Sequence, residues 1–74
     1  MKTVRSLGLK TRELRLRAGL SQEELAVKAW VSRKWLNEFE NGKTSVNASK
    51  VLDVLQALGY EVDVVPITPV GNEQ

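Results

Sequence analysis

The chain has 74 residues, enough for one small domain with a modest hydrophobic core, and its 11 Lys and Arg against 9 Asp and Glu give a net charge of +2. It contains no cysteine and no histidine, which excludes disulfides, thiolate metal sites, the most common zinc ligand and the most common general base. No apolar run approaches the roughly 20 residues of a membrane span, and the N-terminus has no signal-peptide pattern, so we expect a cytoplasmic protein.

The first predicted helix runs from about Ser6 to Ala18. Leu7, Leu14 and Ala18 recur at helical spacing, which assigns them to its buried face. Gly19 follows directly and is a typical helix stop.

A second helix is predicted to begin at Ser21, which forms a capping box with Glu24. The serine side chain accepts a hydrogen bond from the backbone N–H of Glu24, and the glutamate reaches back to that of Ser21. We expect this helix to end near Trp30, because a new N-cap, Ser32, follows within two residues. Its narrow apolar face consists of Leu25, Ala26 and Ala29.

A third helix is predicted from Arg33 to Glu40, since Asn41 and Gly42 both tolerate the left-handed conformation that ends a helix. A fourth runs from about Asn47 to Leu58 and stops at Gly59. Its predicted buried stripe is Val51, Leu52, Val54, Leu55 and Leu58.

After the fourth helix the period of the sequence changes from helical to two. Residues 60–64, Tyr-Glu-Val-Asp-Val, alternate apolar and acidic side chains, which predicts a half-buried strand before Pro66 and Pro69 interrupt it. The remaining residues, 67–74, are expected to form a loose tail.

The second and third predicted helices have the form of a DNA-binding helix-turn-helix. Two short helices joined by one tight turn can place the second in the major groove, and the small Ala26 allows them to cross closely while Val31, Leu36 and Phe39 fill the angle. The charge distribution agrees, because residues 1–43 hold 10 Lys and Arg against 5 acids and residues 44–74 hold 1 against 4. A basic half of this kind suits contact with phosphates.

Several segments of the sequence match a known family in order and spacing. They are Leu7-Gly8, Arg12-Glu13-Leu14-Arg15, the run from Gly19 to Ala26, Val31-Ser32-Arg33 and Glu40-Asn41-Gly42-Lys43. Over residues 7–59 the chain resembles the phage-repressor (Cro/CI, or XRE) helix-turn-helix family. Residues 31–43, with the Leu-Gly pair and strand that follow, resemble more narrowly the HipB-type antitoxins.

The resemblance implies an all-α fold of the lambda-repressor type, with four to five helices, that binds an inverted-repeat operator on double-stranded DNA as a homodimer. The HipB-type subgroup adds a short C-terminal β-strand that pairs across the dimer, and a HipA-like kinase toxin as partner. The implied organisation is a DNA-binding domain in residues 1–59, a dimerisation strand in 60–66 and a tail in 67–74. The chain departs from the pattern at Thr11, where the family has Ile or Leu, and at Trp30, where the family has a glycine with positive φ. A tryptophan at that position is either strained or reshapes the turn.

The candidate DNA-binding residues lie mainly on the third helix. Arg33 and Lys34 suit the O6 and N7 acceptors of guanine, and Asn37 suits a bidentate contact with adenine. Gln22, at the positive end of the second helix, is expected to bond a phosphate through its side-chain amide. The remaining candidates are the N-cap Ser32, Trp35 as either core packing or a DNA contact, and Lys43 and Thr44 as phosphate contacts.

The resemblance also pairs Arg15 with Glu40 in an internal salt bridge. We expect the C-terminal strand to pair antiparallel with that of a second copy and to place Tyr60, Val62 and Val64 against the fourth helices, since a lone strand leaves its backbone and apolar side chains uncovered. The alternative is a tail strand that lies on its own domain. The acids Glu23, Glu24, Glu38 and Glu40 are assigned to caps, ion pairs and solvated faces, so we expect no enzyme activity, no cofactor and no metal.

Three functions are compatible with this sequence. The first is a transcriptional repressor that is also the antitoxin of a HipB/HipA-like pair regulating its own operon, and the second is a stand-alone phage or chromosomal regulator without a toxin. The third, a protein-interaction module that has lost DNA binding, is disfavoured by the basic first half and by the intact run Ser32-Arg33-Lys34.

Overall fold

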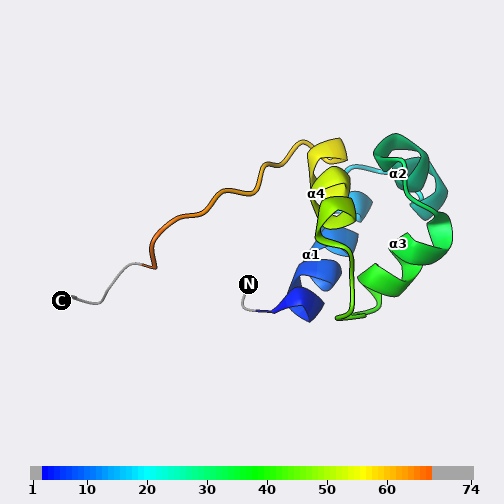
Figure 1. The fold of residues 1–74 in the computed structure, drawn as a ribbon. Coiled ribbons are helices and arrows are strands. Elements are labelled where there is room, and N and C mark those ends of the chain that lie inside the picture. Colours follow the sequence, from blue (N-terminus) through cyan, green and yellow to red (C-terminus); the bar gives the residue numbers. More distant parts are fainter. Residues whose placement is uncertain (1–2, 68–74) are drawn as a thin grey trace.

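The computed structural model describes residues 3–67, and in this range it contains four helices and no strand (Figure 1). The helices are α1 (Val4–Arg17), α2 (Gln22–Ala29), α3 (Arg33–Glu40) and α4 (Ala48–Ala57). All four predicted helices are therefore confirmed. The largest shift is at the start of α1, two residues earlier than predicted, because the Thr3 side chain caps it by accepting from the backbone N–H of Ser6.

The core lies where α2, α3 and α4 meet. Its larger cluster consists of Leu25, Ala26, Ala29, Leu36 and Val54, and a second cluster under α1 consists of Phe39, Val51 and Leu55. The apolar face predicted for α2 is thus fully buried. On α4 the prediction was wrong for Leu52, which is 48% exposed, because that side of the helix has no neighbour in the described chain.

The buried face of α1 is not the predicted one. Its buried residues are Gly8, Thr11 and Arg15, whereas Leu7 and Leu14 are partly buried and Ala18 is exposed. The polar side chains of Thr11 and Arg15 can face inward because each has a hydrogen-bond partner there. The Thr11 hydroxyl, for example, donates to the Leu7 carbonyl oxygen at 2.8 Å, so no hydrogen bond is lost at this fully buried position.

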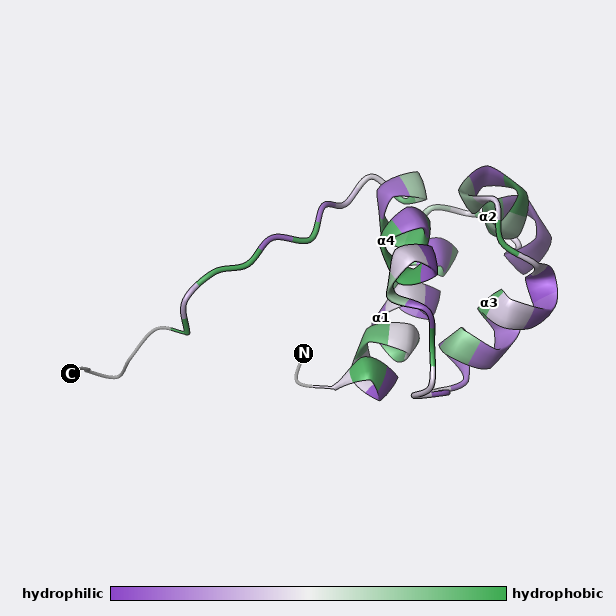
Figure 2. Cartoon of the chain, viewed as in Figure 1, coloured by the Kyte–Doolittle hydropathy of each residue, from purple (hydrophilic) through white to green (hydrophobic). Residues whose placement is uncertain are grey.

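The segment from Tyr60 to Ile67 leaves the helices after Gly59 and runs away from them as an extended chain (Figure 1). It is exposed throughout, and apolar and polar residues alternate along it from Tyr60 to Val64 (Figure 2). The predicted strand makes no ladder within the described residues of this single chain, so its pairing with a second copy stays a prediction. The predicted tail lies almost wholly outside the described residues.

No helix in the described part of the chain is long and apolar enough to cross a membrane.

Candidate DNA-binding surface

The turn between α2 and α3 keeps the geometry of a helix-turn-helix although a tryptophan occupies its tightest position. Trp30 ends α2 with φ 60° and ψ 39°, and no other non-glycine residue of the described chain has a positive φ. The side chain is 93% exposed, so its bulk meets no neighbour in this conformation. The turn is therefore not reshaped; the tryptophan adopts the left-handed backbone in which a glycine would be unstrained.

Ser32 fixes the start of α3 directly after this turn. Its side chain accepts a hydrogen bond from the backbone N–H of Trp35 at 3.0 Å, and the Val31 N–H donates to the Ala26 carbonyl oxygen at 3.0 Å. These bonds hold the first turn of α3 against α2. The predicted capping role of Ser32 is confirmed.

The N-terminus of α2 carries the predicted capping box. Ser21 Oγ accepts from the Glu24 N–H at 3.0 Å, and Glu24 Oε1 accepts from the Ser21 N–H at 2.8 Å. The hydrogen bonds from the backbone and hydroxyl of Ser21 hold the pKa of the Glu24 carboxyl below its ordinary value. The first-turn N–H groups of Gln22 and Glu23 have no partner inside the helix and are free to donate to an anion, while the carboxylates of Glu23 and Glu24 lie in the same turn.

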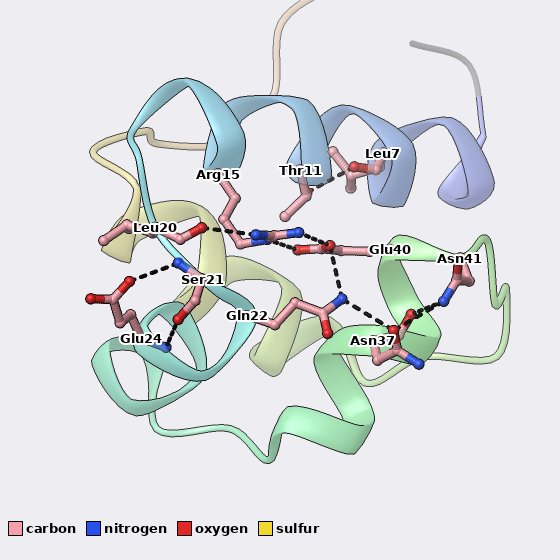
Figure 3. A network of polar contacts seen from close by, with 10 residues as sticks. All are labelled: Leu7, Thr11, Arg15, Leu20, Ser21, Gln22, Glu24, Asn37, Glu40 and Asn41. Carbon is pink, nitrogen blue, oxygen red and sulfur yellow. Dashed lines mark hydrogen bonds and ion pairs between the residues drawn. The ribbon is translucent and has the colours of Figure 1, made fainter.

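Arg15 and Glu40 join α1 to α3 through a bidentate ion pair (Figure 3). Arg15 Nε donates to Glu40 Oε2 at 2.8 Å and Nη2 donates to Oε1 at 2.9 Å, while Nη1 donates to the Leu20 carbonyl oxygen at 2.8 Å. The side chains are 8% and 1% exposed. Both charges are thus compensated in a place where water does not reach them.

A chain of amide groups continues from this ion pair to the outer face of α3 (Figure 3). Gln22 Nε2 donates to Glu40 Oε1 at 3.2 Å and to Asn37 Oδ1 at 3.1 Å. Asn41 Nδ2 donates to the same Asn37 Oδ1 at 3.2 Å and to the Asn37 carbonyl oxygen at 2.8 Å. The amide nitrogen of Gln22, expected to bond a phosphate, is therefore turned towards α3.

Asn41 was not among the predicted site residues. The sequence held a signal for it, since Asn37 and Asn41 are four residues apart on one helix and can hydrogen-bond. The contact with Gln22, 15 residues from Asn37 in sequence, depends on how α2 and α3 cross and had no such signal.

Two cations stand at the exposed start of α3. Arg33 and Lys34 are exposed, and neither has an acidic partner within the described part of the chain. With Gln22 and Asn37 they line a shallow hollow between α2 and α3. The structure thus brings four predicted site residues together on one open face.

The other candidates are more dispersed. Trp35 is half-buried between the two core clusters, its ring stacked on Phe39 at 5.1 Å between centroids, so packing accounts for this side chain. Lys43 Nζ lies 3.3 Å from Glu38 Oε1, and Thr44 is exposed beside it. Neither lines the hollow of Arg33 and Lys34.

This fold and this surface are those of a DNA-binding helix-turn-helix protein. The chain belongs to the XRE-type helix-turn-helix family, whose profile matches residues 12–65. It is a DNA-binding transcriptional regulator and not an enzyme.

Three named proteins are similar to it. An uncharacterised HTH-type transcriptional regulator, y4mF, of Sinorhizobium fredii is 38% identical over 64 residues, covering 86% of this chain and 84% of that protein. The control protein C.BamHI of Bacillus amyloliquefaciens is 31% identical over 67 residues, covering 88% and 83%. The propionyl-CoA carboxylase regulator of Cereibacter sphaeroides is 41% identical over 55 residues, covering 74% of this chain and 12% of that protein. No solved structure matches the chain significantly.

Proposed function

We propose that the protein is a sequence-specific repressor that binds an inverted-repeat operator as a homodimer, with α3 of each copy in the major groove. The observation that carries this proposal is the exposed start of α3, where Arg33 and Lys34, which have no acidic partner among residues 3–67, lie beside Asn37. Unpaired cations at this end of a helix can donate to guanine O6 and N7. Because Ser32 caps α3 and the Arg15–Glu40 pair joins it to α1, the backbone that carries these cations is already ordered before DNA binds.

The phosphate contacts in this proposal come from around α3. The first-turn N–H groups of Gln22 and Glu23 take one phosphate at the positive end of α2. On the other side Lys43 and Thr44, directly after α3, reach another, and Lys43 exchanges its surface partner Glu38 for the DNA. Such contacts position the helix and carry no sequence information.

The homodimer is supported by the C-terminal segment. Val62 is 57% exposed and Val64 is 95% exposed, and their backbone has no ladder partner in the described chain. Between this segment and α1 lies an open groove whose apolar lining includes Leu7, Leu14 and Leu55. Antiparallel pairing of two such segments would satisfy the backbone groups and cover this apolar surface.

A second candidate, the antitoxin of a HipB/HipA-like pair, is favoured by the resemblance of residues 31–43 to that subgroup. Trp30 and Val27, which are 93% and 74% exposed, offer a protein partner an apolar surface beyond the hollow of α3. Two of the similar proteins are named as a transcriptional regulator and a control protein, and neither name mentions a toxin. We therefore prefer the stand-alone regulator, which requires no toxin partner. A kinase-like reading frame beside the gene, together with co-purification of its product with this protein, would support the antitoxin role.

Selection of bound sequences from a random DNA pool, followed by gel shifts with the selected operator, tests the main proposal. We expect an inverted repeat, and losses of about 1 to 3 kcal/mol in binding for Arg33→Ala or Lys34→Ala, with relaxed base preference. Lys28→Ala is the matched control, since it removes an exposed cation that lies near Trp30 and not at the hollow. Equal losses from all three variants would contradict a reading role for α3.

A further inference from the structure

We infer that Asn37 acts at the DNA as a hydrogen-bond donor alone, and therefore reads guanine and not adenine at the base pair it meets. The inference rests on the proposed operator binding and concerns how one side chain is oriented before DNA arrives. An asparagine that binds adenine bidentately accepts from adenine N6 with Oδ1 and donates to N7 with Nδ2. In this structure Oδ1 is not available for that purpose.

Both lone pairs of Asn37 Oδ1 are already used. Gln22 Nε2 donates to it at 3.1 Å from α2, and Asn41 Nδ2 donates to it at 3.2 Å from the end of α3. A carbonyl oxygen has two lone pairs, so a third donor would have to displace one of these amides. Nδ2 points away from the network and receives no partner from the described residues (Figure 3).

The orientation of these amides is set by two groups that can only accept. The Glu40 carboxylate, held by the Arg15 guanidinium, requires that Gln22 turn its nitrogen inward, since the amide oxygen would face a negative charge. The main-chain carbonyl oxygen of Asn37 likewise requires the nitrogen of Asn41. With both nitrogens fixed, the atom of Asn37 between them must be the oxygen. The buried ion pair thus determines which atom of Asn37 faces the DNA.

The chemistry of this donor favours guanine. Guanine presents two neighbouring acceptors, N7 and O6, to the two hydrogens of Nδ2, whereas adenine presents one acceptor beside an amino group that donates. The Gln22 oxygen has the complementary role, because its nitrogen is fully used and only an acceptor remains. Substituting Gln22 is therefore expected to alter base preference and not only general affinity.

The test compares sequences selected by the full-length wild type, Asn37→Ala and Asn41→Ala. The base pair at which Asn37→Ala loses preference identifies its contact, and the wild type should select guanine there. In the operator, 7-deazaguanine at that pair should weaken wild-type binding about tenfold and Asn37→Ala binding less than twofold. Asn41→Ala frees one lone pair of Oδ1 and should admit adenine beside guanine. Should Asn41→Ala unfold, Gln22→Ala serves the same purpose, because it removes the other hydrogen bond to Asn37 Oδ1.

Each result decides the matter. A wild-type preference for adenine, thymine or cytosine at this position would overturn the inference, as would strict guanine preference in both Asn41→Ala and Gln22→Ala. An operator that Asn37→Ala recognises unchanged at every position would overturn the inference while leaving the proposed function intact. A wild-type protein that selected no sequence at all would remove the proposed function and this inference together.

Discussion

Gly8 of α1 lies directly against the main chain of Phe39 in α3: a β-carbon at Gly8 would stand 2.0 Å from the Phe39 carbonyl oxygen. That oxygen belongs to backbone and cannot rotate away, so the distance between α1 and α3 depends on this glycine. The same approach brings Arg15 within reach of Glu40 and so positions the helix that carries the candidate DNA-binding residues.

Gly8→Ala should therefore lower the free energy of unfolding by about 2 kcal/mol or more, because overpacking exceeds the gain in helix propensity. Urea unfolding followed by circular dichroism measures it. Gly19→Ala is the control: it has open space around it but a φ of +73°, so we expect a loss of about 1 kcal/mol from backbone strain alone. A Gly8→Ala protein as stable as wild type would show that α1 and α3 are not in close contact.

Arg15→Met should cost about 3 to 5 kcal/mol of stability, because it leaves the Glu40 carboxylate buried without its partner. Arg17→Met removes a comparable pair with Glu13, whose side chains are 67% and 49% exposed, and should cost under about 1 kcal/mol. Chemical unfolding of both variants gives the comparison. Similar small losses in the two would mean that the Arg15 pair is open to water.

Trp30→Gly should raise the free energy of unfolding by about 1 kcal/mol, since glycine adopts a φ of 60° without the clash of a β-carbon. Little packing is lost because the indole is 93% exposed. Trp30→Ala keeps the backbone strain and should show little of this gain in thermal unfolding. If alanine stabilised the protein as much as glycine, the tryptophan side chain and not its backbone would be the source of the strain.

The capping box of α2 should make stability depend on pH in the acid range. The hydrogen bonds of Ser21 lower the pKa of Glu24 in the folded protein from its ordinary value of 4.5, so the folded state binds this proton less readily than the unfolded state. The stabilisation is present above pH 4.5 and is lost as the pH falls through the lowered pKa. We expect wild type to exceed Glu24→Ala in stability at pH 7 by more than at pH 3, in parallel urea titrations. A constant difference would exclude the ionised carboxylate as the cause.

Truncation after Gly59 should give a monomer by analytical ultracentrifugation, with operator affinity reduced by orders of magnitude because the two half-sites no longer bind as one linked event. Truncation after Ile67 keeps the alternating segment and should remain dimeric. For the full-length protein, operator affinity should also fall steeply with salt. If the chain ending at Gly59 still dimerised, the segment after α4 would not be the dimerisation element.

The sequence alone determined the four helices and, apart from the start of α1, their ends to within one residue, because these depend on residues three or four positions apart. Ser21, Ser32 and Asn47 each cap a helix by accepting from a backbone N–H three residues later, a contact that needs no other part of the fold. The exposed cations Arg33 and Lys34 follow from the same local pattern.

Only the tertiary structure decided which side of each element is buried and which atoms face outward. The apolar spacing of α1 assigned Leu7, Leu14 and Ala18 to the core, yet Gly8 and Arg15 lie inside, because close approach to α3 and a charged partner 25 residues away outweigh apolar area. In the same way, the side-chain amide of Gln22 contains both a donor and an acceptor, and the sequence alone does not say which of them faces outward. The crossing of α2 and α3 sets the donor against Glu40 and Asn37 and leaves the acceptor for the solvent or the DNA.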